Sequence, residues 1–297
     1  MNVAAPQTPL LRAVYHGYVA LFFAYLAAPL VAASVFAFHD SEFAGFPWMG
    51  FTLDWFFGDR EPRLGLFHDR RLLQGLANSL FVAVFVATLS VFVGTTNAFL
   101  FERRNFPGKA FLSILMVVPL VIPGVIIGIS ILVFASTIAN PLEDALNRDL
   151  PLLRPGLFLV VLGQFSFLTT ITTLVIAARL RKFDVALEEA AQNLGAGHAR
   201  VLATVTLPFL RPALIAAYLV AFLMSFENFN TTLMLVGSDS PLTVTMYDRM
   251  VKGGSTPVLN AISLFLIIGS GTLALISVLI QREPPAADAA LVIGDAE

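Results

Sequence analysis

The feature that most constrains the fold is a set of six long apolar stretches separated by more polar segments. About 20 mostly apolar residues in a helix are enough to cross a bilayer. Charged residues make up 13% of the 297 residues and apolar residues 57%, whereas an ordinary soluble domain has about 25% charged residues. The sequence therefore predicts an all-α membrane protein with one domain over residues 1–297. The expected spans are residues 17–38, 76–100, 111–135, 156–178, 212–236 and 258–280.

The distribution of Lys and Arg predicts the orientation of these spans, because cytoplasmic loops are enriched in both. With the N-terminus inside, ten of these residues fall on the cytoplasmic side and eight outside, and the densest clusters are at 101–109 and 179–182. We therefore expect both termini in the cytoplasm. The first stretch is longer than the apolar core of a signal peptide, about 7–15 residues, so we expect it to be retained. Residues 282–297, rich in proline and acids, are expected to be disordered.

Several classes of site are excluded by what the sequence lacks. The chain has no cysteine, and its four histidines do not have the spacing of metal ligands, so no metal site is predicted. The sequence has no basic patch interleaved with aromatic residues, so nucleic-acid binding is not predicted. No phosphate-binding loop is present, because Pro107-Gly108-Lys109-Ala110 lacks the upstream glycine and the hydroxyl that such a loop needs.

A polar segment at about 180–208 interrupts the apolar chain between the fourth and fifth stretches. Asp184 is placed to cap a short helix, and Gly195 stands where that helix would end. A second helical pattern covers 199–206, and Pro208 begins the next span. The segment predicts two short cytoplasmic helices that dock on another protein, since a helix lying on a membrane would present aromatics and basic residues. The apolar face of the first helix is formed by Leu187, Ala190, Ala191 and Leu194.

The same segment resembles the EAA loop of ATP-binding-cassette importer permeases. The resemblance lies in Glu189-Ala190-Ala191, then three residues, Gly195, nine residues, and Val205-x-Leu207-Pro208. It implies the type I importer permease fold, with six transmembrane helices and a cytoplasmic two-helix coupling loop. It also implies that Glu189, with Glu188 beside it, contacts the ATPase. Gly195 would form the turn, and Leu207-Pro208 would join the second short helix to the fifth span.

The resemblance implies partners as well. The chain would be a non-catalytic transport subunit in the bacterial inner membrane, surrounded by lipid. Two copies of a cytosolic ATPase subunit would bind ATP and Mg²⁺ in its place. A second, homologous permease chain and a periplasmic or extracellular substrate-binding protein would complete the importer.

Polar residues inside the apolar stretches indicate where a substrate passes, because charges within spans are costly and usually functional. Glu227 is the clear case in the fifth stretch, accompanied by Asn228 and Asn230, and Gln164 lies in the fourth. We predict that these four residues line the substrate path or its gate. A lone acid would suit a cationic substrate, whereas the neighbouring Ser and Thr residues are expected to join helices by hydrogen bonds.

The third stretch contains two prolines and two glycines within VVPLVIPGVIIG. Pro119 and Pro123 are expected to kink the helix, and Gly124 and Gly128 to loosen it. Either a bent helix lining a moving pore or ordinary irregularity of a membrane helix fits this pattern.

The stretch MSFENFNTTLMLVGSD and the PLTVTMYDRM that follows resemble spermidine/putrescine permeases, and the similarity extends along nearly the whole chain. That family commonly has two acids after Ser-Phe, where this chain has Glu227-Asn228. The resemblance implies polyamine import. The alternatives are import of another small organic solute, such as an amino-acid-like compound, an opine or an aminophosphonate, and an ion-coupled secondary transporter.

Overall fold

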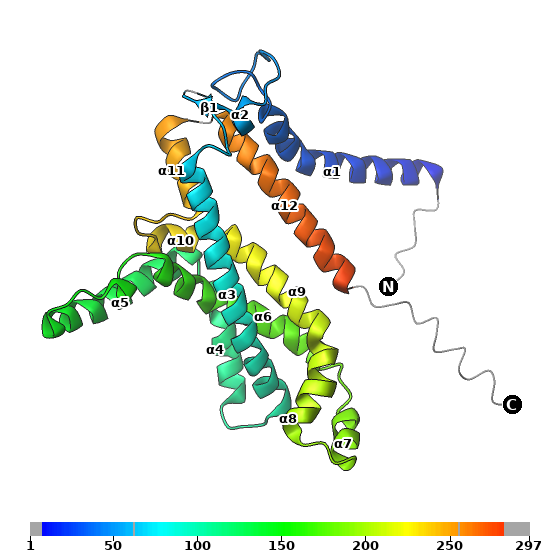
Figure 1. Ribbon diagram of the computed structural model, residues 1–297. Helices are drawn as coiled ribbons and strands as arrows, with labels where there is room; N and C mark the ends of the chain where they lie inside the picture. Colours follow the sequence, from blue (N-terminus) through cyan, green and yellow to red (C-terminus); the bar gives the residue numbers. More distant parts are fainter. Residues whose placement is uncertain (1–7, 62, 255, 282–297) are drawn as a thin grey trace. The chain divides into compact units, whose positions relative to one another are not determined.

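The computed structural model describes residues 8–61, 63–254 and 256–281, and most of these residues are in helices. The predicted disordered tail, 282–297, lies outside them. Figure 1 labels the helices and strands. They are α1 (Pro9–Phe36), α2 (Asp54–Phe57), β1 (Asp59–Arg60), β2 (Arg63–Leu64), α3 (Arg70–Arg103), α4 (Lys109–Val121), α5 (Gly124–Leu146), η1 (Pro151–Leu153), α6 (Leu157–Leu180), α7 (Ala186–Asn193), α8 (His198–Val201), the π-helical turn η2 (Leu202–Thr206), α9 (Leu207–Phe226), α10 (Asn230–Leu235), α11 (Leu242–Gly253) and α12 (Pro257–Gln281).

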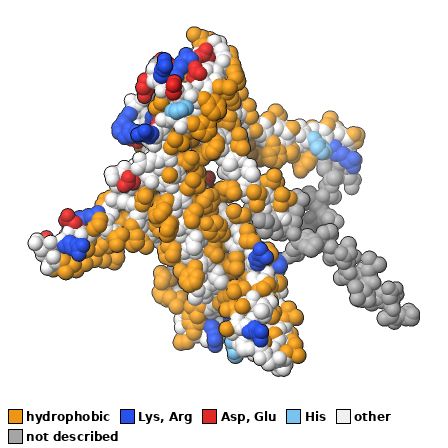
Figure 2. All heavy atoms as spheres, in the orientation of Figure 1, with side chains coloured by type: hydrophobic (Ala, Val, Ile, Leu, Met, Phe, Trp, Pro, Cys, Tyr) orange, Lys and Arg blue, Asp and Glu red, His pale blue; other side chains and the backbone are white. Residues whose placement is uncertain are grey.

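Within the described residues, six helices are long and apolar enough to cross a membrane, which confirms the predicted number of spans. Hydrophobic side chains cover most of the helix surface visible in Figure 2, and charged side chains gather at a few places. The six candidate spans are Pro9–Phe36, Arg70–Arg103, Gly124–Leu146, Leu157–Leu180, His198–Phe226 and Pro257–Ile276.

The chain divides into two compact units. The first consists of Met1–Leu73 and Met246–Gly269, and the second of Gln74–Thr245 and Ser270–Glu297. Each is described separately.

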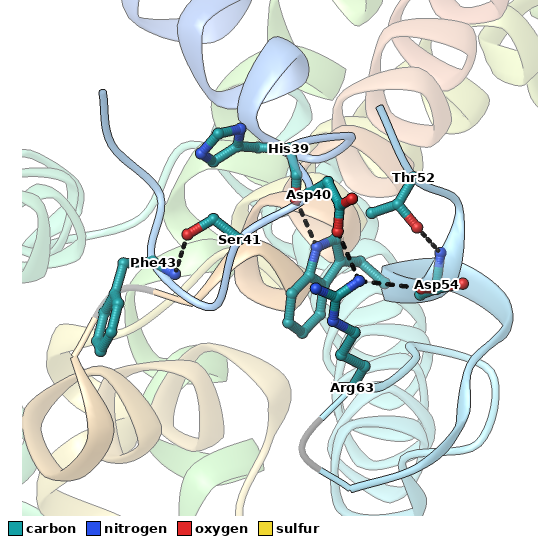
Figure 3. Close-up of polar contacts among 8 residues, drawn as sticks. His39, Asp40, Ser41, Phe43, Thr52, Asp54 and Arg63 are labelled. Atoms are coloured by element: carbon teal, nitrogen blue, oxygen red, sulfur yellow. Dashed lines mark hydrogen bonds and ion pairs between the residues drawn. The ribbon is translucent and has the colours of Figure 1, made fainter. Parts of the chain in front are cut away.

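In the first unit, the segment between α1 and α3 is a folded loop held by polar contacts (Figure 3). Arg63 donates to the Asp40 carboxylate at 2.5 Å and to the Asp54 carboxylate at 3.3 Å. These hydrogen bonds, the one to Asp40 first, raise the pKa of the Arg63 guanidinium. The indole N–H of Trp55 donates to the carbonyl of the buried His39 at 2.7 Å.

The same loop ends at Asp69, which is buried and fixes the start of α3. One carboxylate oxygen accepts from the backbone N–H groups of Arg71 and Leu72 at 3.0 and 3.1 Å, as an N-cap residue does. The other pairs with Arg249 of α11. Because both oxygens have donors, part of the cost of burying the carboxylate is offset.

In the second unit, α6 is the central helix, and more than half of its most apolar 18-residue stretch is buried. Leu159, Val160 and Leu168 of α6 pack in one apolar cluster with Val82 of α3 and Leu235 of α10. The hydroxyl of Thr172 in α6 also donates to the carbonyl of Ser90 in α3 at 2.7 Å. Most of the core of this unit is therefore built around α6.

Two of the predicted spans differ from the structure. The stretch 111–135 is not one helix: α4 ends at Val121, Ile122 is extended, and α5 begins at Gly124, so the candidate span moves to Gly124–Leu146. Proline disfavours helical conformation in the residue before it, and Pro123 imposes that on Ile122.

The stretch 212–236 is also interrupted. Helix α9 ends at Phe226, with Glu227 as its C-cap, and the short helix α10 follows from Asn230. The side-chain oxygen of Asn228 accepts from the backbone N–H of Thr232 at 3.3 Å. A side chain that bonds the nearby backbone in this way competes with a continuous helix.

Candidate functional site

Helix α7, the first of the two predicted short helices, starts as the sequence indicates. The side chain of Asp184 accepts from the backbone N–H of Ala186 at 3.0 Å, and the backbone carbonyl of Asp184 accepts from Leu187 at 3.2 Å. Both bonds satisfy groups that the first turn of a helix leaves without partners.

The turn after α7 depends on Gly195. Its φ of 88° lies in the left-handed region, which glycine adopts at little cost. The N–H of Gly195 donates to the carbonyl of Gln192 at 2.8 Å, and that of Ala196 donates to the carbonyl of Ala191 at 3.1 Å. This pair of bonds is a Schellman motif, which satisfies the last carbonyls of a helix. Gly195 therefore forms the turn, as predicted.

The outer surface of α7 combines apolar and acidic side chains. Leu194 is 90% exposed and Leu187 53% exposed. Glu189 and Ala190 are also exposed, and Ala191 is half-buried. An apolar helix face left open in this way suits a groove on another protein.

Glu188 lies differently from its neighbour Glu189. Its carboxylate oxygen Oε1 accepts from the hydroxyl of Thr206 at 2.6 Å and from the guanidinium of Arg103 at 3.3 Å. Its side chain is only 22% exposed. Sequence reasoning grouped the two acids and missed Arg103 as a site residue. The signal available was the basic cluster at 101–109, which served only to orient the spans.

The second short helix runs directly into the fifth span, and Leu207 and Pro208 are the first two residues of that span's helix, α9. Helix α8, the turn η2 and helix α9 follow one another without a break. The N–H of Leu207 donates to the carbonyl of Leu202, a π-helical bond. Pro208, which has no N–H and would crowd the preceding turn of an α-helix, is accommodated by this wider turn.

The residues predicted to line the substrate path fall into two groups. Gln164 is 1% exposed, and its amide nitrogen donates to the hydroxyl of Thr232 at 2.8 Å, while its oxygen accepts from Ser225. The Thr232 hydroxyl donates in turn to the Asn228 side chain at 3.1 Å. The structure therefore joins Gln164 and Asn228 in one buried network between α6, α9 and α10.

Glu227 and Asn230 lie outside that network. Both are exposed, at the two ends of the break between α9 and α10. Helix α9 has 20 residues, which corresponds to about 30 Å at 1.5 Å per residue. Glu227 is therefore about one hydrocarbon thickness along the helix from Leu207, where α9 begins.

Comparisons with known proteins identify the family to which the chain belongs. Residues 87–283 match the family described as "Binding-protein-dependent transport system inner membrane component". The chain is 28% identical to the spermidine/putrescine transport system permease protein PotC of Escherichia coli K12 over 272 residues, 92% of this chain and 95% of PotC. It is 33% identical to the molybdenum transport system permease protein ModB of the same organism over 212 residues, 70% of this chain and 91% of ModB.

The fold is also found in solved structures. A chain in the crystal structure of a bacterial ABC transporter for import of the acidic polysaccharide alginate aligns with a TM-score of 0.71 and 18% identity, covering 91% of this chain and 94% of that one. At that identity the likeness concerns the fold. The family match covers more than half of the chain. The protein therefore belongs to the inner-membrane components of binding-protein-dependent transport systems, as a multi-pass, non-catalytic permease subunit of an ABC importer.

Proposed function

We propose that this permease carries polyamines, with spermidine and putrescine as its substrates. The observation that supports this most is the 28% identity to PotC over 92% of the chain. A second support is the exposed carboxylate of Glu227 at the break between α9 and α10. A negative group at that place attracts a cation and repels an anion.

The segment from α7 to η2 acts as the coupling loop in this proposal. Its exposed face, with Glu189 and Leu194, docks on a cytosolic ATPase, of which the importer contains two copies that bind ATP and Mg²⁺. Because α8, η2 and α9 are continuous, a displacement of the loop is carried directly into α9. In the proposed arrangement, the coupling loop and both termini lie on the cytoplasmic side of the membrane.

The importer needs further chains to enclose a path. A second, homologous permease chain pairs with this one, and a substrate-binding protein delivers the substrate from outside. Glu227, Asn228 and Asn230 meet the substrate at the outer end of α9. Gln164 acts on the path through Asn228, because both polar atoms of its amide are used in the buried network.

The 33% identity to ModB supports a different substrate class, a molybdenum oxyanion. The side chain of Glu227 distinguishes the two substrate classes, because its carboxylate would attract a polyamine cation and repel an oxyanion. Other small organic solutes are the broader alternative.

The experiment is uptake of labelled spermidine, putrescine and molybdate into proteoliposomes that hold this chain with its partner permease, ATPase and binding protein. ATP-dependent uptake of either polyamine supports the proposal, and uptake of molybdate alone contradicts it.

The Glu227→Gln variant tests the role of the carboxylate. We expect the rate of polyamine uptake at low substrate concentration to fall about fivefold, because an exposed charge contributes about 1 kcal/mol to attracting a cation. Raising the salt concentration should reduce the difference between variant and wild type. Asp149→Asn, the same change at an exposed residue between α5 and α6, serves as the control. Equal uptake by wild type and Glu227→Gln at every salt concentration would remove Glu227 from the path.

A further inference from the structure

The cytoplasmic end of α3 is tied to the coupling loop at two points. Arg103, the last residue of α3, donates to Glu188 of α7 at 3.3 Å. Glu102, one residue earlier, accepts from Arg181 at 2.8 Å, just after α6 ends. These two ion pairs join one helix end to both the beginning of the loop and its first helix.

Two aromatic rings also contact the cations at this end of α3 and α6. The guanidinium of Arg103 lies 5.3 Å from the ring centre of Phe183, which is 6% exposed. Phe183 contacts Phe209 of α9 edge to face at 5.0 Å, and Phe209 lies under the guanidinium of Arg179 at 4.3 Å. Stacked cations and rings of this kind resist relative movement because each contact is attractive and partly shielded from water.

Glu188 is the point where these connections meet. One of its oxygens receives both the Arg103 guanidinium and the hydroxyl of Thr206, and Thr206 is fully buried in the turn η2. The carboxylate therefore joins three elements: α7, the end of α3, and the junction of η2 with α9. Its neighbour Glu189 is exposed and free to contact another protein.

We propose that Arg103 is a positioning residue that transmits movement of the coupling loop to the second span. This inference rests on the proposed coupling role of the loop. Force applied to α7 through Glu189 passes at the preceding residue, Glu188, into α3 as well as into α9. The two helices then move together once per cycle of the ATPase. Without the contact between Arg103 and Glu188, movement of the loop still reaches α9 through the continuous backbone, but it no longer reaches α3 through Glu188.

The test uses the complete reconstituted importer and measures substrate taken up per ATP hydrolysed. In Arg103→Gln and in Glu188→Gln we expect this ratio to fall about fivefold, with ATP hydrolysis continuing. The double variant should be no worse than either single one, because both remove the same interaction. The charge-exchanged variant, Arg103→Glu with Glu188→Arg, should recover part of the ratio. A residue that only stabilised the fold would lower assembly and leave the ratio of the assembled transporter unchanged.

Arg104→Gln is the matched control. Arg104 follows Arg103 and lines a pocket that Arg103, Glu188 and Thr206 also line, but it is exposed and forms no ion pair among the described residues. Thr206→Val removes the second donor to Glu188 without altering charge, so the test stands even where a charge variant does not assemble. A ratio equal to wild type in Arg103→Gln, Glu188→Gln and Thr206→Val would overturn the inference.

Glu189→Arg separates this inference from the proposed function. If Glu189→Arg abolishes uptake and the Arg103 and Glu188 variants keep the normal ratio, only the inference fails. If Glu189→Arg also has no effect, the proposed coupling role of the loop fails with it.

Discussion

The Glu189→Arg variant is expected to lose at least about 30-fold in ATP-driven uptake, the largest functional effect of any single change in this chain. Glu189 is exposed on α7, on the side of the coupling loop that we propose meets the ATPase. Disrupting a buried charge contact across such an interface costs about 2–5 kcal/mol, and 2 kcal/mol corresponds to about 30-fold. The measurement is uptake in proteoliposomes together with copurification of the ATPase. We expect the complex to remain assembled, because the second permease chain that we propose would also hold the ATPase pair.

Asp149→Arg is the control for this change. It reverses the same charge at an exposed residue outside the coupling loop, so it should leave ATP-driven uptake within about twofold of wild type. Normal uptake by Glu189→Arg, with ATP hydrolysis still required, would show that α7 does not transmit the action of the ATPase through this side.

The Gly128→Val variant is expected to cause a large loss of stability. Gly128 of α5 faces α10 closely: a Cβ atom placed on it would lie 2.7 Å from the Cβ of Met234 and 3.0 Å from the backbone carbonyl oxygen of Thr231. Neither atom can move without moving α10. Overpacking of this kind costs about 3 kcal/mol, which corresponds to a lower thermal midpoint by roughly 10 °C.

Transport should fall in the same variant, because α10 carries Thr232, the residue that joins Gln164 to Asn228. Gly17→Val is the matched control. Gly17 is in α1, and an added Cβ there would meet no atom of the chain within 4 Å. Thermal unfolding of the purified chain in detergent, followed by light scattering or size exclusion, compares the two. Similar midpoints for Gly128→Val and wild type would contradict the close packing of α5 and α10.

Gly128 also shows how the structure changes an interpretation based on sequence. The glycines after Pro123 were expected to loosen a kinked helix. In the structure, Gly124 and Gly128 allow α10 to approach α5, and Gly163 allows the same approach to α6. A sequence shows that a position lacks a side chain, but the neighbour that occupies the space is set by the tertiary fold. Small residues at membrane helix interfaces generally have this role.

The break in the third apolar stretch falls at Pro123, where a kink was expected, but the break in the fifth could not be located from the sequence. Apolar composition and length identify a span, but a helix inside a membrane protein can be interrupted wherever neighbouring side chains satisfy the freed backbone groups. At Asn228 the neighbour is Thr232, held in turn by Gln164 from another helix. Gln164 and Asn228 are 64 residues apart in the chain. Hydropathy contains no information about such a distant partner.

The sequence alone determined the number of spans, the family, and the start and end of α7. These depend on local chemistry: long apolar stretches, a capping Asp184, and a glycine at a left-handed position, Gly195. Only the tertiary structure decided which of two adjacent acids faces inward. Successive residues on a helix point about 100° apart, so packing of α7 against the end of α3 and the turn η2 gives Glu188 two donors and leaves Glu189 exposed. No local pattern distinguishes the two acids, because the difference lies in Arg103 and Thr206, which reach Glu188 from distant parts of the chain.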